Sequence, residues 1–148
     1  MRAAYKALSH SIAGLVAVQA ALIALATAGL LHWVEEGNTL TPAAVKSEDT
    51  GATGAIGFAL HSGIGMILIP LLTVALVVVA VLLKEKAART WAIALLVTVV
   101  VQVGLGTAAE AVPFLGLVHG LLALVVAWLG WHAASVVGRE QPAGTARA

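Results

Sequence analysis

Four long apolar stretches dominate the chain, at residues about 11–31, 56–83, 91–109 and 113–137. Each is long enough to cross a bilayer core of about 30 Å, because an α-helix rises about 1.5 Å per residue. The composition also indicates a membrane protein, since 61% of the residues are hydrophobic and only 10% are charged. In soluble domains about a quarter of the residues are charged. We therefore predict an all-α fold: a four-helix transmembrane bundle, embedded in the lipid bilayer, that occupies residues 1–137 as one domain.

The charged residues between the stretches predict how the chain crosses the membrane. Basic residues precede the first stretch, separate the second from the third and follow the fourth: Arg2, Lys6, Lys84, Lys86, Arg89, Arg139 and Arg147. Since basic loops stay in the cytoplasm, we expect both termini on the cytoplasmic side of a bacterial plasma (inner) membrane. Residues 138–148 are expected to form a disordered cytoplasmic tail. The acidic loop 32–55 is expected outside, with one short helix near 42–46. No clear small-residue cleavage site follows the first stretch, so we expect it to be retained.

Net charge and cysteine content exclude several classes of function. The formal net charge is +1 and there are no cysteines. The chain is therefore not a polycation built for nucleic acid, and it has neither disulfides nor thiolate metal sites. No carboxylate lies inside a stretch, and no nucleophile motif, phosphate loop or zinc spacing is present. We predict no catalytic residue and lean against an enzyme.

Two histidines lie inside the predicted membrane, in its outer half. His61 is five residues past Ile56 and His119 is six residues past Pro113. Because both helices start at the outer face, the two imidazoles lie at nearly the same depth, about 8 Å below it. A neutral imidazole nitrogen is a good axial ligand, and haem iron accepts two of them. The pattern predicts one b-type haem per chain, with His61 and His119 as the iron ligands.

Small residues surround both histidines, as a flat macrocycle that meets two helices would require. The glycines predicted to border the cofactor are Gly57, Gly63 and Gly65 near His61, and Gly116 and Gly120 near His119. His32, on the same side of the membrane, is a candidate partner of a haem propionate. His132, toward the inner end of the fourth stretch, is interpreted as an interfacial anchor.

The two histidines also belong to a weak internal repeat. "LVAVQAALIALATAG" in the first stretch resembles "LLVTVVVQVGLGTAA" in the third through Gln19 and Gln102, and "ALHSGIG" resembles "LVHGLLA" through His61 and His119. A two-helix unit used twice, with both copies running in the same direction, would explain the match. Chance similarity between Ala-, Val- and Leu-rich helices is the alternative.

Four spans with histidines on the second and the fourth resemble one four-helix half of the haem A synthase family. The matching stretches are "HSGIG" and "VHGLLAL", with 58 residues from His61 to His119, and the resemblance covers the four spans but not the outer loop or the tail. It implies a haem-binding membrane domain in which both histidines are axial ligands of a b-type haem. In the catalytic half of that family a glutamate lies one helical turn before the first histidine. Here those positions are Gly57 and Phe58, which argues against methyl-oxidising activity.

The leading interpretation is a cytochrome b-like protein with bis-histidine ligation, for electron transfer, haem carriage or sensing. A second copy of the chain and a respiratory or redox membrane protein are the candidate partners. Three alternatives stay open. The first is a haem-free accessory or assembly subunit, whose histidines bond to Gln19, Thr27, Gln102 or Thr107 on neighbouring helices. The second is a small transporter with pH-responsive histidines, and the third is a dimeric haem-modifying enzyme related to haem A synthase.

Overall fold

The computed structural model describes residues 1–47 and 51–138 (for 45–47 the backbone only), and each regular element in those residues is helical. The elements are α1 (Arg2–Glu35), α2 (Pro42–Ser47), α3 (Ile56–Gly63), η1 (Ile64–Leu68), α4 (Ile69–Leu83), α5 (Lys86–Ala108) and α6 (Phe114–Val136). η1 is one π-helical turn, and α3, η1 and α4 run on as a single helix of 28 residues. Within the described residues, four helices are long and apolar enough to cross a membrane. The prediction of an all-α bundle of four candidate transmembrane helices is confirmed.

The helix bounds differ most from the prediction at α1. This helix begins at Arg2 and ends at Glu35, where the sequence predicted a span of about 11–31. No proline interrupts it, and Gly37, whose φ is +90°, follows its last residues. α2 agrees with the short helix predicted near 42–46, and the hydroxyl of Thr41 accepts a hydrogen bond from the backbone N–H of Ala44 (3.2 Å), as an N-cap does. The predicted disordered tail at 138–148 lies outside the described residues, except for Gly138.

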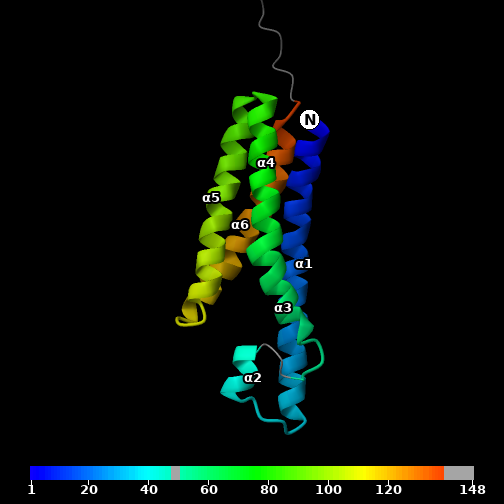
Figure 1. Ribbon diagram of the computed structural model, residues 1–148, viewed down its shortest axis with the longest axis vertical. Coiled ribbons are helices and arrows are strands. Elements are labelled where there is room, and N and C mark those ends of the chain that lie inside the picture. Colours follow the sequence, from blue (N-terminus) through cyan, green and yellow to red (C-terminus); the bar gives the residue numbers. More distant parts are fainter. Residues whose placement is uncertain (48–50, 139–148) are drawn as a thin grey trace, which may run out of the picture.

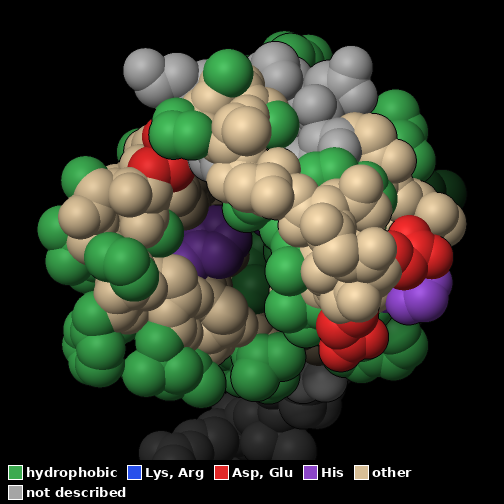
Figure 2. All heavy atoms as spheres, turned by 90° about the horizontal axis from the view of Figure 1, so that it is seen from below, with side chains coloured by type: hydrophobic (Ala, Val, Ile, Leu, Met, Phe, Trp, Pro, Cys, Tyr) green, Lys and Arg blue, Asp and Glu red, His purple; other side chains and the backbone are tan. Residues whose placement is uncertain are grey.

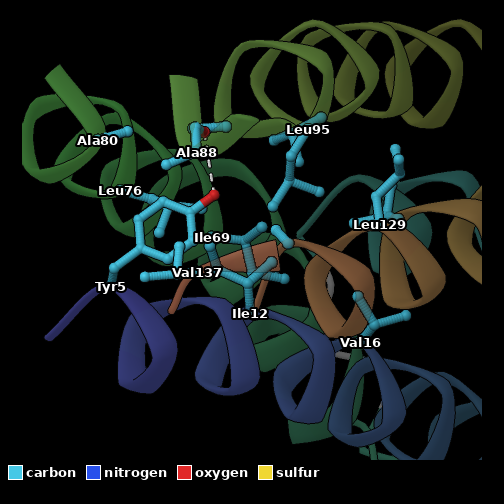
Figure 3. Close-up of a cluster of buried hydrophobic side chains, with 14 residues drawn as sticks. Tyr5, Ile12, Val16, Ile69, Leu76, Ala80, Ala88, Leu95, Leu129 and Val137 are labelled. Atoms are coloured by element: carbon cyan, nitrogen blue, oxygen red, sulfur yellow. Dashed lines mark hydrogen bonds between the residues drawn. The ribbon is translucent and has the colours of Figure 1, made fainter. Parts of the chain in front are cut away.

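The long helices form a ring in which α1 packs against α4 and α6, and α5 packs against the same two. The N-terminus, the last residues of α6 and the α4–α5 turn lie at one end of the bundle, which we call the terminal end (Figure 1). α2 and the α5–α6 turn lie at the opposite end, which we call the loop end. At the terminal end Arg2 pairs with Glu85 (2.8 Å), and the Tyr5 hydroxyl donates to the Ala88 carbonyl (3.0 Å; Figure 3). These two contacts tie the start of α1 to the α4–α5 turn.

The hydrophobic core occupies the half of the bundle next to the terminal end. Its members come from all four long helices: Tyr5, Ile12, Val16, Ile69, Leu76, Ala80, Ala88, Ala92, Leu95, Val99, Val126, Leu129, Ala133 and Val137 (Figure 3). Among the described residues of α5 and α6, the buried ones run only as far as Val99 and begin only at Val126. The halves of these two helices next to the loop end are therefore not packed into the core. Figure 1 shows α5 and α6 leaning away from α3 in that half.

The π-helical turn η1 follows from the proline just after it. Pro70 has no backbone N–H, and its ring would meet the carbonyl of Met66 in a regular α-helix. The chain widens instead, and the N–H of Ile69 donates to the carbonyl of Ile64, five residues back. Such single π-turns are frequent at functional sites. This one directly follows the last turn of α3, which carries His61.

Candidate functional site

The structure brings two histidines together in the unfilled half of the bundle. His61 on α3 and His119 on α6 have ring centroids 6.2 Å apart, with ring planes inclined by 62°. Both side chains are half-buried. The number of residues from each helix start predicted that the two rings lie at the same depth. The structure shows in addition that the helices pack so that the rings lie close together across the bundle.

Each imidazole is held by a backbone carbonyl of a neighbouring helix. Nδ1 of His61 lies 3.1 Å from the carbonyl oxygen of Gln19 on α1, and Nδ1 of His119 lies 3.0 Å from that of Gln102 on α5. A carbonyl oxygen can only accept a hydrogen bond, so Nδ1 carries the proton in both rings. In the neutral imidazole the lone pair is then on Nε2. Both rings are therefore in the tautomer that binds a metal through Nε2, with Nδ1–H anchored as in many metal-ligating histidines.

The side chains of the same two glutamines carry buried polar atoms in this half of the bundle. The Gln102 amide nitrogen donates to the His119 backbone carbonyl (3.0 Å) and lies 3.4 Å from Nε2 of that ring. Among the described residues, the Gln102 amide oxygen and both polar atoms of the Gln19 amide have no hydrogen-bond partner. Buried polar groups are rarely left unpaired, because each costs about 1–3 kcal/mol. The site therefore has unused hydrogen-bonding capacity.

The sequence had suggested the glutamine side chains as hydrogen-bond partners of the histidines. For Nδ1 of both rings the partner is the glutamine backbone instead. A backbone carbonyl within a helix carries no residue-specific signal, so only the weak repeat around Gln19 and Gln102 pointed to these positions.

A hollow opens between the helices at the loop end. Figure 2 views this end directly: histidine surface is visible inside the hollow, and acidic side chains lie on the rim of this face. Glu35, Glu36 and Glu110 are exposed residues of this end. Since His61 and His119 lie in the same half of the bundle and keep part of their surface, we interpret the hollow as the approach to the pair.

The three glycines predicted near His61 have different surroundings. A Cβ at Gly57 would lie 2.5 Å from the carbonyl oxygen of Leu22, so this glycine allows α3 to pack closely on α1. A Cβ at Gly65 would lie 3.7 Å from the side-chain nitrogen of Gln19, beside the buried amide. A Cβ at Gly63 would meet nothing within 4 Å in the described part of the chain. Gly57 therefore serves helix packing, and Gly65 lies closest to the site.

The glycines near His119 include one that the sequence reasoning missed. A Cβ at Gly116 would lie 3.8 Å from Cβ of Ala109 across the α5–α6 turn, and one at Gly120 would meet no described atom within 4 Å. Gly106 on α5 was not singled out, but a Cβ there would lie 3.0 Å from Cε1 of His119 and 3.2 Å from its Nδ1. The imidazole of His119 thus packs against the open face of Gly106. Gly106 lies one helical turn after Gln102 in the same apolar stretch, and this position is the sequence feature from which its role could have been predicted.

The other histidines do not join the pair. His32 is exposed on the last turn of α1, with Nε2 3.4 Å from the carboxylate of Glu36, and it lies about 20 Å along the helix from Gln19 at 1.5 Å per residue. His132 stacks on Trp128 (5.0 Å) and meets Trp91 (4.2 Å) near the terminal end. This packing agrees with the anchoring interpretation of His132.

The donor set limits what the site could hold. The described residues contain no group of three or more His, Asp or Glu side chains that could bind a metal ion. Two imidazoles alone fall short of the four ligands that a structural zinc site takes. A haem supplies its own equatorial nitrogens and takes its axial ligands from the protein. Two histidines whose Nδ1 atoms are anchored, so that Nε2 is the ligating nitrogen, match that requirement.

Comparison with protein-family models, with curated proteins and with solved structures finds no match to this chain. The resemblance to haem A synthase stays a prediction, of which the structure shows the bundle of four long apolar helices.

Proposed function

We propose that this protein is a membrane-embedded b-type haem protein, with His61 and His119 as the axial ligands and electron transfer, haem carriage or haem sensing as its role. The proposal rests above all on one observation. Two imidazoles from different helices lie 6.2 Å apart, each anchored through Nδ1 to a carbonyl. This anchoring leaves Nε2 of each ring as the nitrogen that would bind the iron.

The spacing of the rings supports this assignment. Metal–nitrogen bonds of about 2 Å, plus about 1 Å from each nitrogen to its ring centroid, place two imidazoles on opposite sides of one metal with centroids about 6 Å apart. The centroids of His61 and His119 are 6.2 Å apart. The separation of the two rings therefore matches the one expected for two imidazoles that share one metal.

The surroundings of the pair also fit a bulky group. In this half α5 and α6 have no buried residues among those described, a hollow reaches in from the loop end, and the amide of Gln19 is buried without a partner among the described residues (Figure 2). A haem would supply one-electron chemistry there. The chain orients both rings through the carbonyls of Gln19 and Gln102, which fix the tautomer and raise the basicity of Nε2. Ligation by both histidines would leave the iron no permanently open position, which favours electron transfer or carriage over oxygen chemistry.

The charges at the two ends support the proposed orientation. The terminal end carries the basic residues Arg2, Lys6, Lys84, Lys86 and Arg89, whereas Glu35, Glu36 and Glu110 lie at the loop end. By the positive-inside rule the terminal end faces the cytoplasm, in a bacterial inner membrane, and the histidine pair lies near the outer face. A second copy of the chain and a redox protein of the same membrane are the proposed partners.

One alternative has an observation in its favour. Both ring nitrogens of His119 and Nδ1 of His61 already have neighbours with which they can form hydrogen bonds. A haem-free accessory subunit would use the histidines for these interhelical bonds alone. Such a protein would be colourless.

The test is an optical spectrum of the detergent-purified protein, expressed with ample haem, before and after dithionite reduction. We expect sharp α and β bands on reduction, lost in both His61→Ala and His119→Ala. His132→Ala, which removes an imidazole packed among tryptophans at the other end, is the matched control and keeps the bands. A colourless wild-type protein, or bands that survive both substitutions, would refute the proposal.

A further inference from the structure

We propose that His119 is the displaceable one of the two axial ligands. When a small neutral diatomic molecule replaces His119 on the iron, the Gln102 amide nitrogen donates a hydrogen bond to Nε2 of the released ring. This inference rests on the proposed haem site and adds a ligand class and a direction of exchange to it.

The two histidines are alike at Nδ1 but differ at Nε2. The Gln102 amide nitrogen lies 3.4 Å from Nε2 of His119. At Nε2 of His61, by contrast, no hydrogen bond occurs among the described residues, and the amide of Gln19 is itself unpaired there. Among the described residues, only His119 thus has a side-chain donor already within hydrogen-bonding distance of its Nε2.

This difference decides which ligand leaves more easily. A lone pair that leaves a metal inside a membrane bundle must find a donor or remain unpaired in a medium of low dielectric constant. Gln102 offers His119 a donor, which His61 lacks in the described residues. One ordinary hydrogen bond changes such an equilibrium by about five-fold. His61 is thus the permanent ligand, and His119 the exchangeable one.

The position of the His119 ring supports the same direction of exchange. The ring packs against Gly106, where a Cβ would lie 3.0 Å from Cε1, and both Gln102 contacts to the ring come from the same helix, α5. The ring can thus rest against α5 without a movement of the helices.

The entrance to the site selects the class of incoming molecule. The exposed carboxylates at the loop end, Glu35, Glu36 and Glu110, disfavour anions. The walls of the site are apolar helices, which favour a small uncharged molecule. In the exchange, Nε2 of His119 leaves the iron with its lone pair, and the incoming molecule donates its own pair in its place. No proton and no electron is transferred.

The experiment uses carbon monoxide as the probe and the full-length, haem-loaded, dithionite-reduced protein in detergent. Rapid mixing and equilibrium titration give the rate and the affinity of carbon monoxide binding. We expect the wild-type protein to form the complex. We expect Gln102→Leu, which removes the amide, and Gln102→Asn, which shortens the side chain that carries it, to lower the affinity for carbon monoxide about five-fold.

Two comparison variants make the result specific to Gln102. Thr98→Val removes a hydroxyl on the same helix that bonds only to the carbonyl of Ala94, and it should bind carbon monoxide as the wild-type protein does. Gln19→Leu removes the corresponding amide beside His61, and its effect should be smaller than that of Gln102→Leu.

The outcomes separate this inference from the proposed function. A wild-type protein that shows the bis-histidine spectrum but binds no carbon monoxide overturns the exchange and leaves the haem site standing. Equal affinities in wild type and Gln102→Leu, or equal losses in Gln102→Leu and Gln19→Leu, overturn the role of Gln102. A protein that binds no haem overturns both proposals.

Discussion

The imidazole of His119 occupies the space that the missing side chain of Gly106 leaves open on α5. A Cβ at that position would lie 3.0 Å from Cε1 and 3.2 Å from Nδ1 of the ring, closer than ordinary van der Waals contact. The placement of the ring thus depends on a residue 13 positions before it in the chain.

The first prediction concerns this contact. Gly106→Ala should push the ring of His119 away from α5 and disturb its bond to the carbonyl of Gln102. We expect the affinity for haem to fall by about ten-fold, as for an overpacking penalty of about 1–2 kcal/mol. Haem-to-protein ratios of purified protein measure the effect. Gly104→Ala, where a Cβ would meet nothing within 4 Å of the described chain, should keep the wild-type ratio. Equal ratios in the two variants would contradict the assignment.

The second prediction concerns the close approach of α3 to α1. Gly57→Ala places a methyl group 2.5 Å from the carbonyl oxygen of Leu22 and 3.0 Å from Cβ of Ala26, and a helix backbone cannot yield as a flexible side chain can. We expect a loss of about 1–3 kcal/mol in the free energy of unfolding. Circular dichroism during unfolding in mixed micelles checks it. Gly14→Ala on α1, where a Cβ meets no described atom within 4 Å, is the control and should be neutral or slightly stabilising.

The third prediction concerns the hydrogen bond that joins α1 to α5. The hydroxyl of Tyr5, which is fully buried, donates to the carbonyl of Ala88 at 3.0 Å. Tyr5→Phe should cost about 0.5–1.5 kcal/mol of stability, the usual net value of such a bond. Arg2→Ala, which breaks the more exposed ion pair with Glu85, should cost less, because surface ion pairs contribute little. The same unfolding assay compares them, and a larger loss for Arg2→Ala would be the contrary result.

The fourth prediction concerns orientation in the membrane. Because the chain has no cysteine, single cysteines can be introduced without background labelling. In intact bacterial cells, Asn38→Cys at the loop end should react with a membrane-impermeant maleimide, whereas Lys86→Cys at the terminal end should react only after permeabilisation. The reverse pattern would place the histidine pair on the cytoplasmic side.

The depth of the histidine pair could be predicted from the sequence, but its chemistry could not. Counting residues along two apolar helices places His61 and His119 at one level, since the rise per residue is nearly constant. The partners of Nδ1 depend on the rotation and crossing of four helices. Those were found to be the carbonyls of Gln19 and Gln102, groups that every residue possesses and that no sequence pattern distinguishes.

The glycines illustrate the same division. The sequence predicted a cofactor role for Gly57, whereas its Cβ position points at the backbone of α1, and it passed over Gly106, which lies against the ring of His119. Glycine is common in membrane helices for close packing as well as for ligands. Whether a given glycine serves helix packing or borders a ligand depends on which group packs against it in the folded structure.

The apolar pattern of the sequence is enough to predict four helices, their ends to within a turn or two except at the start of α1, and that His61 and His119 lie at one level along the bundle. Apolar length and helical rise are local properties, so they can be read along the chain. The tertiary structure adds that the core fills the half of the bundle next to the terminal end, that α5 and α6 have no buried residues among those described in the other half, and that His61 and His119 come together with their Nδ1 atoms anchored. Those features arise from how the helices pack around one another, and in a chain so uniformly apolar the sequence pattern leaves that packing unspecified.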